Sequence, residues 1–172
     1  MEDYARILAS RLPPPVGSDK EALIGEFKRL QTMRIQTYHH YNAALVELVQ
    51  ENRLGAYTTL CSHYTSIFSD ISNAVRDVRD QLATQDAALA RLISKIQEIE
   101  KTKLGILAKY HMAYMNSRSP LDFSIHVDAS VDEYTAKIRR LEELVNEEMD
   151  NVQSMLCEDI NVDGASIRGT ES

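Results

Sequence analysis

A single apolar stripe over residues 57–82 constrains the fold of this chain more than any other feature of its sequence. Its members recur at steps of three or four residues, and they are Tyr57, Leu60, Tyr64, Ile67, Ile71, Val75, Val78 and Leu82. This spacing places all of them on one face of an α-helix, which Cys61 and Phe68 widen. Because an isolated helix is marginal in water and each buried Leu, Ile or Tyr contributes roughly 1.5–3 kcal/mol, other helices must cover this face.

An upstream stretch, residues 18–52, carries a second stripe with the same spacing. Ser18 and Glu21 form a predicted capping box at its start, in which each side chain satisfies a backbone N–H group of the first turn. Gly55 is the expected stop after a helix end near Asn52. The positions in this stripe are Leu23, Phe27, Leu30, Arg34, Tyr38, Tyr41, Leu45 and Leu48. Together these features predict one long helix.

Two further helices are predicted downstream. The first is capped by Thr84 or Asp86 and carries an apolar stripe over residues 89–114. The second begins at another predicted capping box, at Ser130, and covers residues 130–157. Short connections between such long helices favour antiparallel neighbours.

Residues 116–129 form the longest predicted connection, with Pro120 near the middle. Apolar and polar residues alternate in it from Leu121 to Val127, which is typical of a strand. Because no partner strand is apparent elsewhere, we interpret this segment as an extended connector. Residues 158–172 are rich in Asp, Asn, Gly, Ser and Thr and are predicted to be disordered.

The composition supports an all-α fold. The 172 residues include six glycines and four prolines, so the chain contains few residues that break helices. We predict an elongated antiparallel bundle of three to four long helices, with a short N-terminal helix and a disordered C-terminal tail. The predicted parts are an N-terminal helix and proline linker (1–17), a three-helix core (18–115), the connector (116–129), a fourth helix (130–157) and the tail (158–172).

Charge and cysteine content restrict the expected partners and compartment. A net charge of -7 repels phosphate, so direct binding of nucleic acid is predicted to be weak or absent. The two cysteines, Cys61 and Cys157, are too few for a disulfide framework, which fits a reducing compartment. Neither a signal peptide nor a membrane span is apparent, so we expect an intracellular protein, nuclear or cytoplasmic or both, without a membrane partner.

Signatures of catalysis are missing from the sequence. The six glycines stand far apart, so they form no phosphate-binding loop. The paired Glu-x-x-His motifs of di-iron bundles do not occur either. Four histidines lie on three predicted helices, but a metal site is the weaker interpretation, and hydrogen-bonded or exposed histidines are the stronger one. They are His39, His40, His63 and His111. We therefore expect no enzyme, no cofactor and no metal.

Tyrosines and charged residues offer two less specific signals. Six tyrosines at helix ends indicate either a core boundary, which we favour, or a binding surface. They are Tyr38, Tyr41, Tyr57, Tyr64, Tyr110 and Tyr114. Basic residues gather on the third long helix, including Arg91, Lys95 and Lys109, and acidic residues gather over 142–150 on the fourth. A solvated charged face is the preferred interpretation of both, over a phosphate site and a basic partner respectively.

Three patterns, one on each of the first three long helices, resemble a known family. The first comprises Phe27, Leu30, Gln31, Arg34, Tyr38 and Tyr41. The second comprises Tyr57, Leu60, Cys61, Thr65, Phe68, Ile71 and Ser72. The third comprises Leu92, Ile93, Ile96, Gln97, Glu100, Lys103, Leu104 and Ala108. In this order they resemble the "required for excision" B-type family, whose members are small helical proteins associated with DNA repair. The resemblance covers roughly residues 23–114.

The resemblance implies a part in excision repair of damaged DNA. We predict a non-enzymatic adaptor that acts through contacts with other proteins. The candidate residues are polar or aromatic members of the stripes, and they are Gln31, Arg34, Tyr38, Tyr41, Gln97, Glu100 and Lys103. Structural register is the favoured role for them, with Arg34 pairing with Glu100, and contact with a partner is the alternative.

Two further questions stay open at the level of sequence. A helical bundle could equally serve as a subunit of a cytoskeletal, ciliary or trafficking assembly. The stripe on the fourth helix could fill a place inside the bundle or form a homodimer, so the oligomeric state is undetermined.

Overall fold

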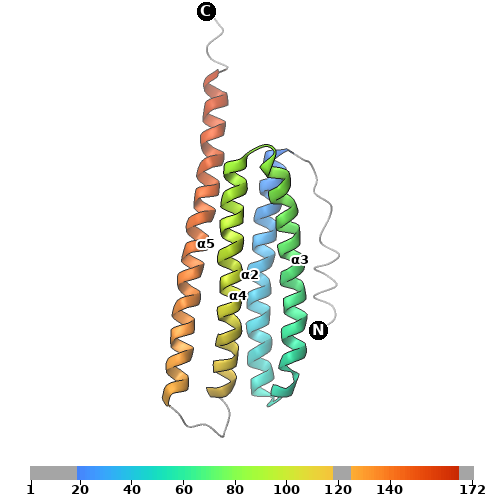
Figure 1. Ribbon diagram of the computed structural model, residues 1–172, viewed down its shortest axis with the longest axis vertical. Coiled ribbons are helices and arrows are strands. Elements are labelled where there is room, and N and C mark those ends of the chain that lie inside the picture. Colours follow the sequence, from blue (N-terminus) through green and yellow to red (C-terminus); the bar gives the residue numbers. More distant parts are fainter. Residues whose placement is uncertain (1–18, 118–124, 167–172) are drawn as a thin grey trace, which may run out of the picture. The chain divides into compact units, whose positions relative to one another are not determined.

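Four long α-helices make up nearly all of the described chain in the computed structural model (Figure 1). They are α2 (Lys20–Gln50), α3 (Tyr57–Ala83), α4 (Ala87–Ser117) and α5 (Ile125–Ser166), with the short 3-10 helix η1 (Leu54–Ala56) between α2 and α3. The structure describes residues 19–117 and 125–166, and side chains over 19–117 and 129–157. No strand occurs in these ranges, so the predicted all-α fold is confirmed. The predicted N-terminal helix lies outside them.

The chain divides into two compact units at Ala87 and Ala88. The first unit contains α2, η1 and α3, and the second contains α4 and α5. The family-like three-helix region therefore crosses this division, because its third helix is α4.

In the first unit, α2 and α3 pack antiparallel. The Nζ atom of Lys20 lies 2.7 Å from the Oδ2 atom of Asp86, which joins the start of α2 to the chain just after α3. At the other end, the hydroxyl oxygens of Tyr41 and Tyr57 are 3.4 Å apart. The predicted stripe of α3 is confirmed as its buried face, with Tyr57 half-buried and the remaining seven buried.

The start of α2 differs from the prediction by one residue. Asp19, rather than Ser18, is the N-cap, and its carboxylate accepts a hydrogen bond of 2.8 Å from the N–H group of Ala22. Ser and Asp are both good caps, so their order in the sequence does not decide between them. The negative charge of Asp19 also interacts favourably with the positive end of the helix dipole.

The end of α2 also differs, because Asn52 rather than Gly55 provides the stop. Asn52 has a φ of 55°, in the left-handed region. Its N–H group donates to the carbonyl of Val49 (3.1 Å), and the N–H group of Arg53 donates to that of Leu48 (2.9 Å). These two bonds form a Schellman motif, in which asparagine substitutes for the more usual glycine. Gly55 lies in η1 instead.

The left-handed backbone at Asn52 leads to a prediction. Asn52→Val is expected to lower the free energy of unfolding by about 1–2 kcal/mol, because a side chain with a Cβ branch is strained at positive φ. Asn52→Gly removes the same side chain without this strain and should be neutral or slightly stabilising. Urea denaturation followed by circular dichroism measures both values. Equal destabilisation by the two variants would contradict the assignment of strain to the backbone.

In the second unit, α4 and α5 are also antiparallel. The Nζ atom of Lys95 lies 2.6 Å from the Oε1 atom of Glu148, and the Nζ atom of Lys103 lies 3.1 Å from the Oε1 atom of Glu142. The earlier lysine of α4 pairs with the later glutamate of α5, as expected for antiparallel helices. The buried positions of α4 are Leu89, Ala90, Ile93, Ile96, Glu100, Lys103, Leu107, His111 and Met115.

The bounds of α5 differ from those predicted. The helix begins at Ile125, so residues 125–129 are helical rather than extended, and Ser130 lies inside the helix instead of capping it. No glycine or proline separates Pro120 from Ser130, and extending an existing helix is easier than starting one. The helix also continues to Ser166, beyond the predicted end at residue 157. Residues 118–124 and 167–172 lie outside the described part.

Candidate functional site

A buried polar cluster joins α2 to α3. Arg34 is 2% exposed, and its Nη2 group donates a hydrogen bond to the Ser72 hydroxyl at 3.2 Å. Its Nη1 group lies 3.4 Å from the Gln31 side-chain oxygen, to which it donates a long hydrogen bond. The Nε2 atom of Gln31 is buried and has no hydrogen-bond partner among the described residues. Because a guanidinium is always charged, its burial requires such partners, and the contact with Ser72 links α2 to α3.

An aromatic cluster lies next to these residues, toward the turn between α2 and α3. Tyr38 packs on Phe68 with ring centroids 4.5 Å apart, and Tyr41 stacks on Tyr64 at 4.7 Å. Burial raises the pKa of Tyr41 well above its ordinary value, and hydrogen bonds with Cys61 and Tyr57 raise it further. The Tyr41 hydroxyl therefore stays protonated at physiological pH. Tyr38 and Tyr41 belong to the core of this unit.

A groove of about 270 Å³ opens at the same end of the first unit. Its apolar lining comes from Ala44 and Leu48 on α2, Ala56 on η1 and Leu60 on α3. Charged and polar side chains form the rest, and they are Glu47, Glu51, Arg53, Thr59 and His63. Glu51 and Arg53 are paired at 2.8 Å. An apolar depression with charged neighbours is a common arrangement for holding an apolar side chain of another molecule.

Sequence reasoning missed this groove. Its lining combines the last turns of α2 with η1 and the first two turns of α3, and the Asn52 motif sets the direction in which the chain leaves α2. The one signal in the sequence is that Leu48 and Leu60 lie near the ends of two stripes, on either side of a short connection.

The three candidates from the third pattern lie on α4. Glu100 and Lys103 are buried, and Gln97 is half-buried. Lys103 is paired with Glu142 of α5. Arg34 and Glu100 belong to different units, so their predicted pairing stays a prediction.

His111, one of the four histidines considered from the sequence, is a buried residue of α4. Its side chain is 0% exposed, and burial lowers its pKa to about 4. It is therefore neutral at physiological pH. The other three histidines differ in exposure, since His39 and His40 are exposed and His63 is half-buried. In the ranges that the structure describes, no three His, Cys, Asp or Glu side chains gather closely enough to hold a metal ion.

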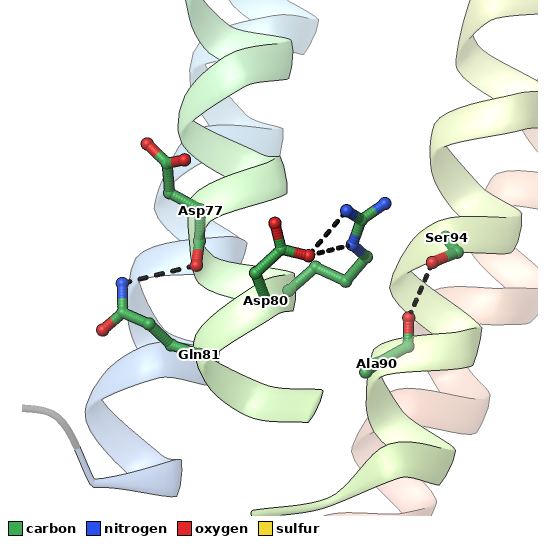
Figure 2. A network of polar contacts seen from close by, with 6 residues as sticks. Asp77, Asp80, Gln81, Ala90 and Ser94 are labelled. Carbon is green, nitrogen blue, oxygen red and sulfur yellow. Dashed lines mark hydrogen bonds and ion pairs between the residues drawn. The ribbon is translucent and has the colours of Figure 1, made fainter. Parts of the chain in front are cut away.

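The charged faces consist largely of local pairs. Figure 2 shows three such contacts on α3 and α4. Arg79 donates to Asp80 through two nitrogens at 2.9 and 2.6 Å, and Gln81 donates to the carbonyl of Asp77 at 3.3 Å. The hydroxyl of Ser94 donates to the carbonyl of Ala90, one turn earlier, at 3.0 Å. Contacts within a helix satisfy these groups without a ligand.

Lys95 and Lys103 of α4 pair with another helix. The acidic stretch of α5 supplies both partners, Glu142 and Glu148. Part of the basic character predicted for α4 is thus neutralised inside the second unit. Arg91 and Lys109 are exposed.

Comparison with known proteins gives one match. The family model described as DNA repair REX1-B matches residues 22–114, which is more than half of the chain. The chain belongs to this family. Its membership confirms the resemblance and associates the chain with DNA repair. No curated protein and no solved structure matches the chain.

The REX1-B match has a clear structural extent. It covers nearly all of α2 together with η1 and α3, and it ends within α4, so α5 lies outside it. Most residues of the three family-like patterns lie on buried faces of these helices. No helix in the described ranges is both long and apolar enough to cross a membrane.

Proposed function

We propose that this chain is a non-enzymatic adaptor in excision repair of DNA, and that it acts in the nucleus by binding other proteins. Membership of the DNA repair REX1-B family supports the process. The observation that carries the adaptor role is the groove at the turn between α2 and α3, which lies inside the matched region.

The lining of the groove indicates how a partner would bind. A partner would insert an apolar side chain between Leu48 and Leu60, because a well-filled pocket of this kind supplies most of the energy of a protein contact. Glu47 is exposed beside it and would favour a basic residue next to the inserted side chain. Tyr41 and Tyr64 stack nearby and keep the walls of the groove rigid.

A substitution in the groove tests this proposal. Thr59→Arg places a bulky cation against the apolar lining, and it is expected to weaken partner binding by about tenfold, or ~1.4 kcal/mol. Thr58→Arg is the matched control, since Thr58 is an exposed neighbour on the same helix that does not line the groove. Affinity purification of each tagged full chain from cells, with quantitative identification of the bound proteins, measures the effect.

Survival after ultraviolet irradiation completes the test. Cells that lack the protein should be sensitised, and the wild-type chain and Thr58→Arg should restore survival where Thr59→Arg does not. Normal survival of cells without the protein would contradict a role in excision repair. Recovery of cytoskeletal, ciliary or trafficking subunits as the principal partners would favour the alternative assembly role instead.

A further inference from the structure

The relation between α4 and α5 is the feature that the proposed function does not use. Nearly all of α4 lies inside the region matched to the family, whereas α5 lies outside it. Two ion pairs join the helices, Lys95 with Glu148 and Lys103 with Glu142. The helix α5, which lies outside the family region, therefore covers charged residues of α4 that lie inside that region.

The residues of α5 that face α4 follow a simple pattern. Glu142, Val145, Glu148 and Val152 recur at steps of three and four, so they share one face of the helix. Val145, Glu148 and Val152 are buried, and Glu142 is half exposed. This face combines two carboxylates for the two lysines with two valines for packing.

Other parts of the contact between α4 and α5 are partly exposed to solvent. The Lys95 side chain is 63% exposed although its partner Glu148 is 5% exposed. Apolar residues in the first half of α5 are half-buried rather than buried, and they are Val131, Tyr134, Ile138 and Leu141. The Cα atoms of α2 and α3 approach within 8 Å at many positions, whereas among the described residues those of α4 and α5 do so far less often. Ion pairs at partly exposed positions are weak and sensitive to salt, so α5 is held less firmly than α3.

We propose that the face of α4 with Lys95 and Lys103 is a docking surface for an acidic amphipathic helix of a partner protein, and that α5 covers this surface in the free chain. The proposal rests on the adaptor function and names the chemistry of one partner. Such a helix carries two carboxylates six residues apart, with a β-branched apolar residue between them and another one turn beyond. Because α5 is tethered, it competes at a high effective concentration, so docking of the partner requires α5 to leave.

A peptide of residues 136–157 serves as the probe for this surface. Its binding to the purified full chain is measured by fluorescence anisotropy at 0.1 M salt. The full-chain variant E142K/E148K should release α5 and bind the peptide at least about tenfold more tightly than the wild-type chain. The matched control E143K/E147K changes the net charge of the chain by the same amount, but at exposed positions of α5. It should bind the peptide like the wild-type chain.

A charge swap locates the binding site on α4. Adding Lys95→Glu to a chain with Glu142→Lys and Glu148→Ala, whose α5 offers no cation to the new carboxylate, should weaken binding of the natural peptide, and a peptide with Glu148→Lys should restore it. Equal binding of both peptides to both chains would overturn the assignment, because it would place the peptide elsewhere.

A second measurement leaves Lys95, Lys103, Glu142 and Glu148 unchanged. Spin labels at positions 101 and 146, with Cys61 and Cys157 replaced by serine, report the distance between α4 and α5. The distance distribution should broaden between 0.1 and 1 M salt, as screening weakens the two ion pairs. An unchanged distribution, together with no peptide binding by E142K/E148K, would overturn the proposal and make α5 a fixed structural helix. These results are independent of survival after ultraviolet irradiation, so they separate a failure here from a failure of the repair role.

Discussion

Replacing Arg34 with alanine is expected to lower the free energy of unfolding by about 3–5 kcal/mol. The side chain is 2% exposed and donates hydrogen bonds to Ser72 and Gln31. Its removal leaves a cavity and takes the donor away from the buried Gln31 oxygen and the partly buried Ser72 oxygen, and each loss is costly. Urea denaturation of the full chain, followed by circular dichroism, measures the change.

Two further substitutions at this position distinguish the roles considered for it. Arg34→Met keeps the length of the side chain without its charge, and it should cost less than Arg34→Ala because a well-packed apolar replacement is often tolerated. Arg34→Lys keeps the charge but lacks the planar fork that reaches both Ser72 and Gln31. A register role predicts a large loss for alanine and an intermediate loss for lysine. A loss below about 1 kcal/mol for alanine, combined with lost partner binding, would favour the partner-contact role instead.

His111 is expected to make the stability of the protein depend on pH. Its pKa is about 4 in the folded chain and 6.5 in its ordinary state, because burial disfavours the charged imidazolium. Between these values the unfolded chain binds the proton and the folded chain does not, so stability falls as pH falls from 6.5 to 4. The size of this loss is about 3 kcal/mol. Above pH 6.5 the residue has no effect on the slope.

The matched comparison is between His111→Leu and His39→Leu. Carboxylates also titrate at low pH, so the useful quantity is the difference in slope between each variant and the wild type. The slope between pH 6.5 and 4 should decrease in His111→Leu, because the buried imidazole is removed, and His39→Leu is the comparison at an exposed position. Identical pH profiles for all three proteins would show that His111 titrates normally in the folded state.

Much of the fold could be predicted from the sequence. The stripe over residues 57–82 predicted α3 to within one residue, because its periodicity is long and uninterrupted. The candidates Gln31, Arg34, Glu100 and Lys103 were recognised as polar members of apolar stripes, and all four are buried. A stripe determines which face of a helix is buried, whatever the chemistry of each side chain.

The ends of the helices were predicted less well. Ser18 and Gly55 were plausible signals, yet Asp19 and Asn52 take those roles. Several residues near a helix end can cap it or stop it, and their energies differ by only about 1 kcal/mol. Ser130 was misassigned because the stretch before it contains no residue that prevents a helix from continuing.

The sequence by itself determined the helical class, the buried faces of α2 and α3 and the family, because these depend on the order of residues along one element. Only the tertiary structure decided which charges meet, as in Lys95 with Glu148 and Arg34 with Ser72. It also decided the neutral state of His111 and the position of the groove beside Leu48 and Leu60. Such features depend on the register and spacing of two helices. Residues that are far apart in the chain determine this register and spacing together.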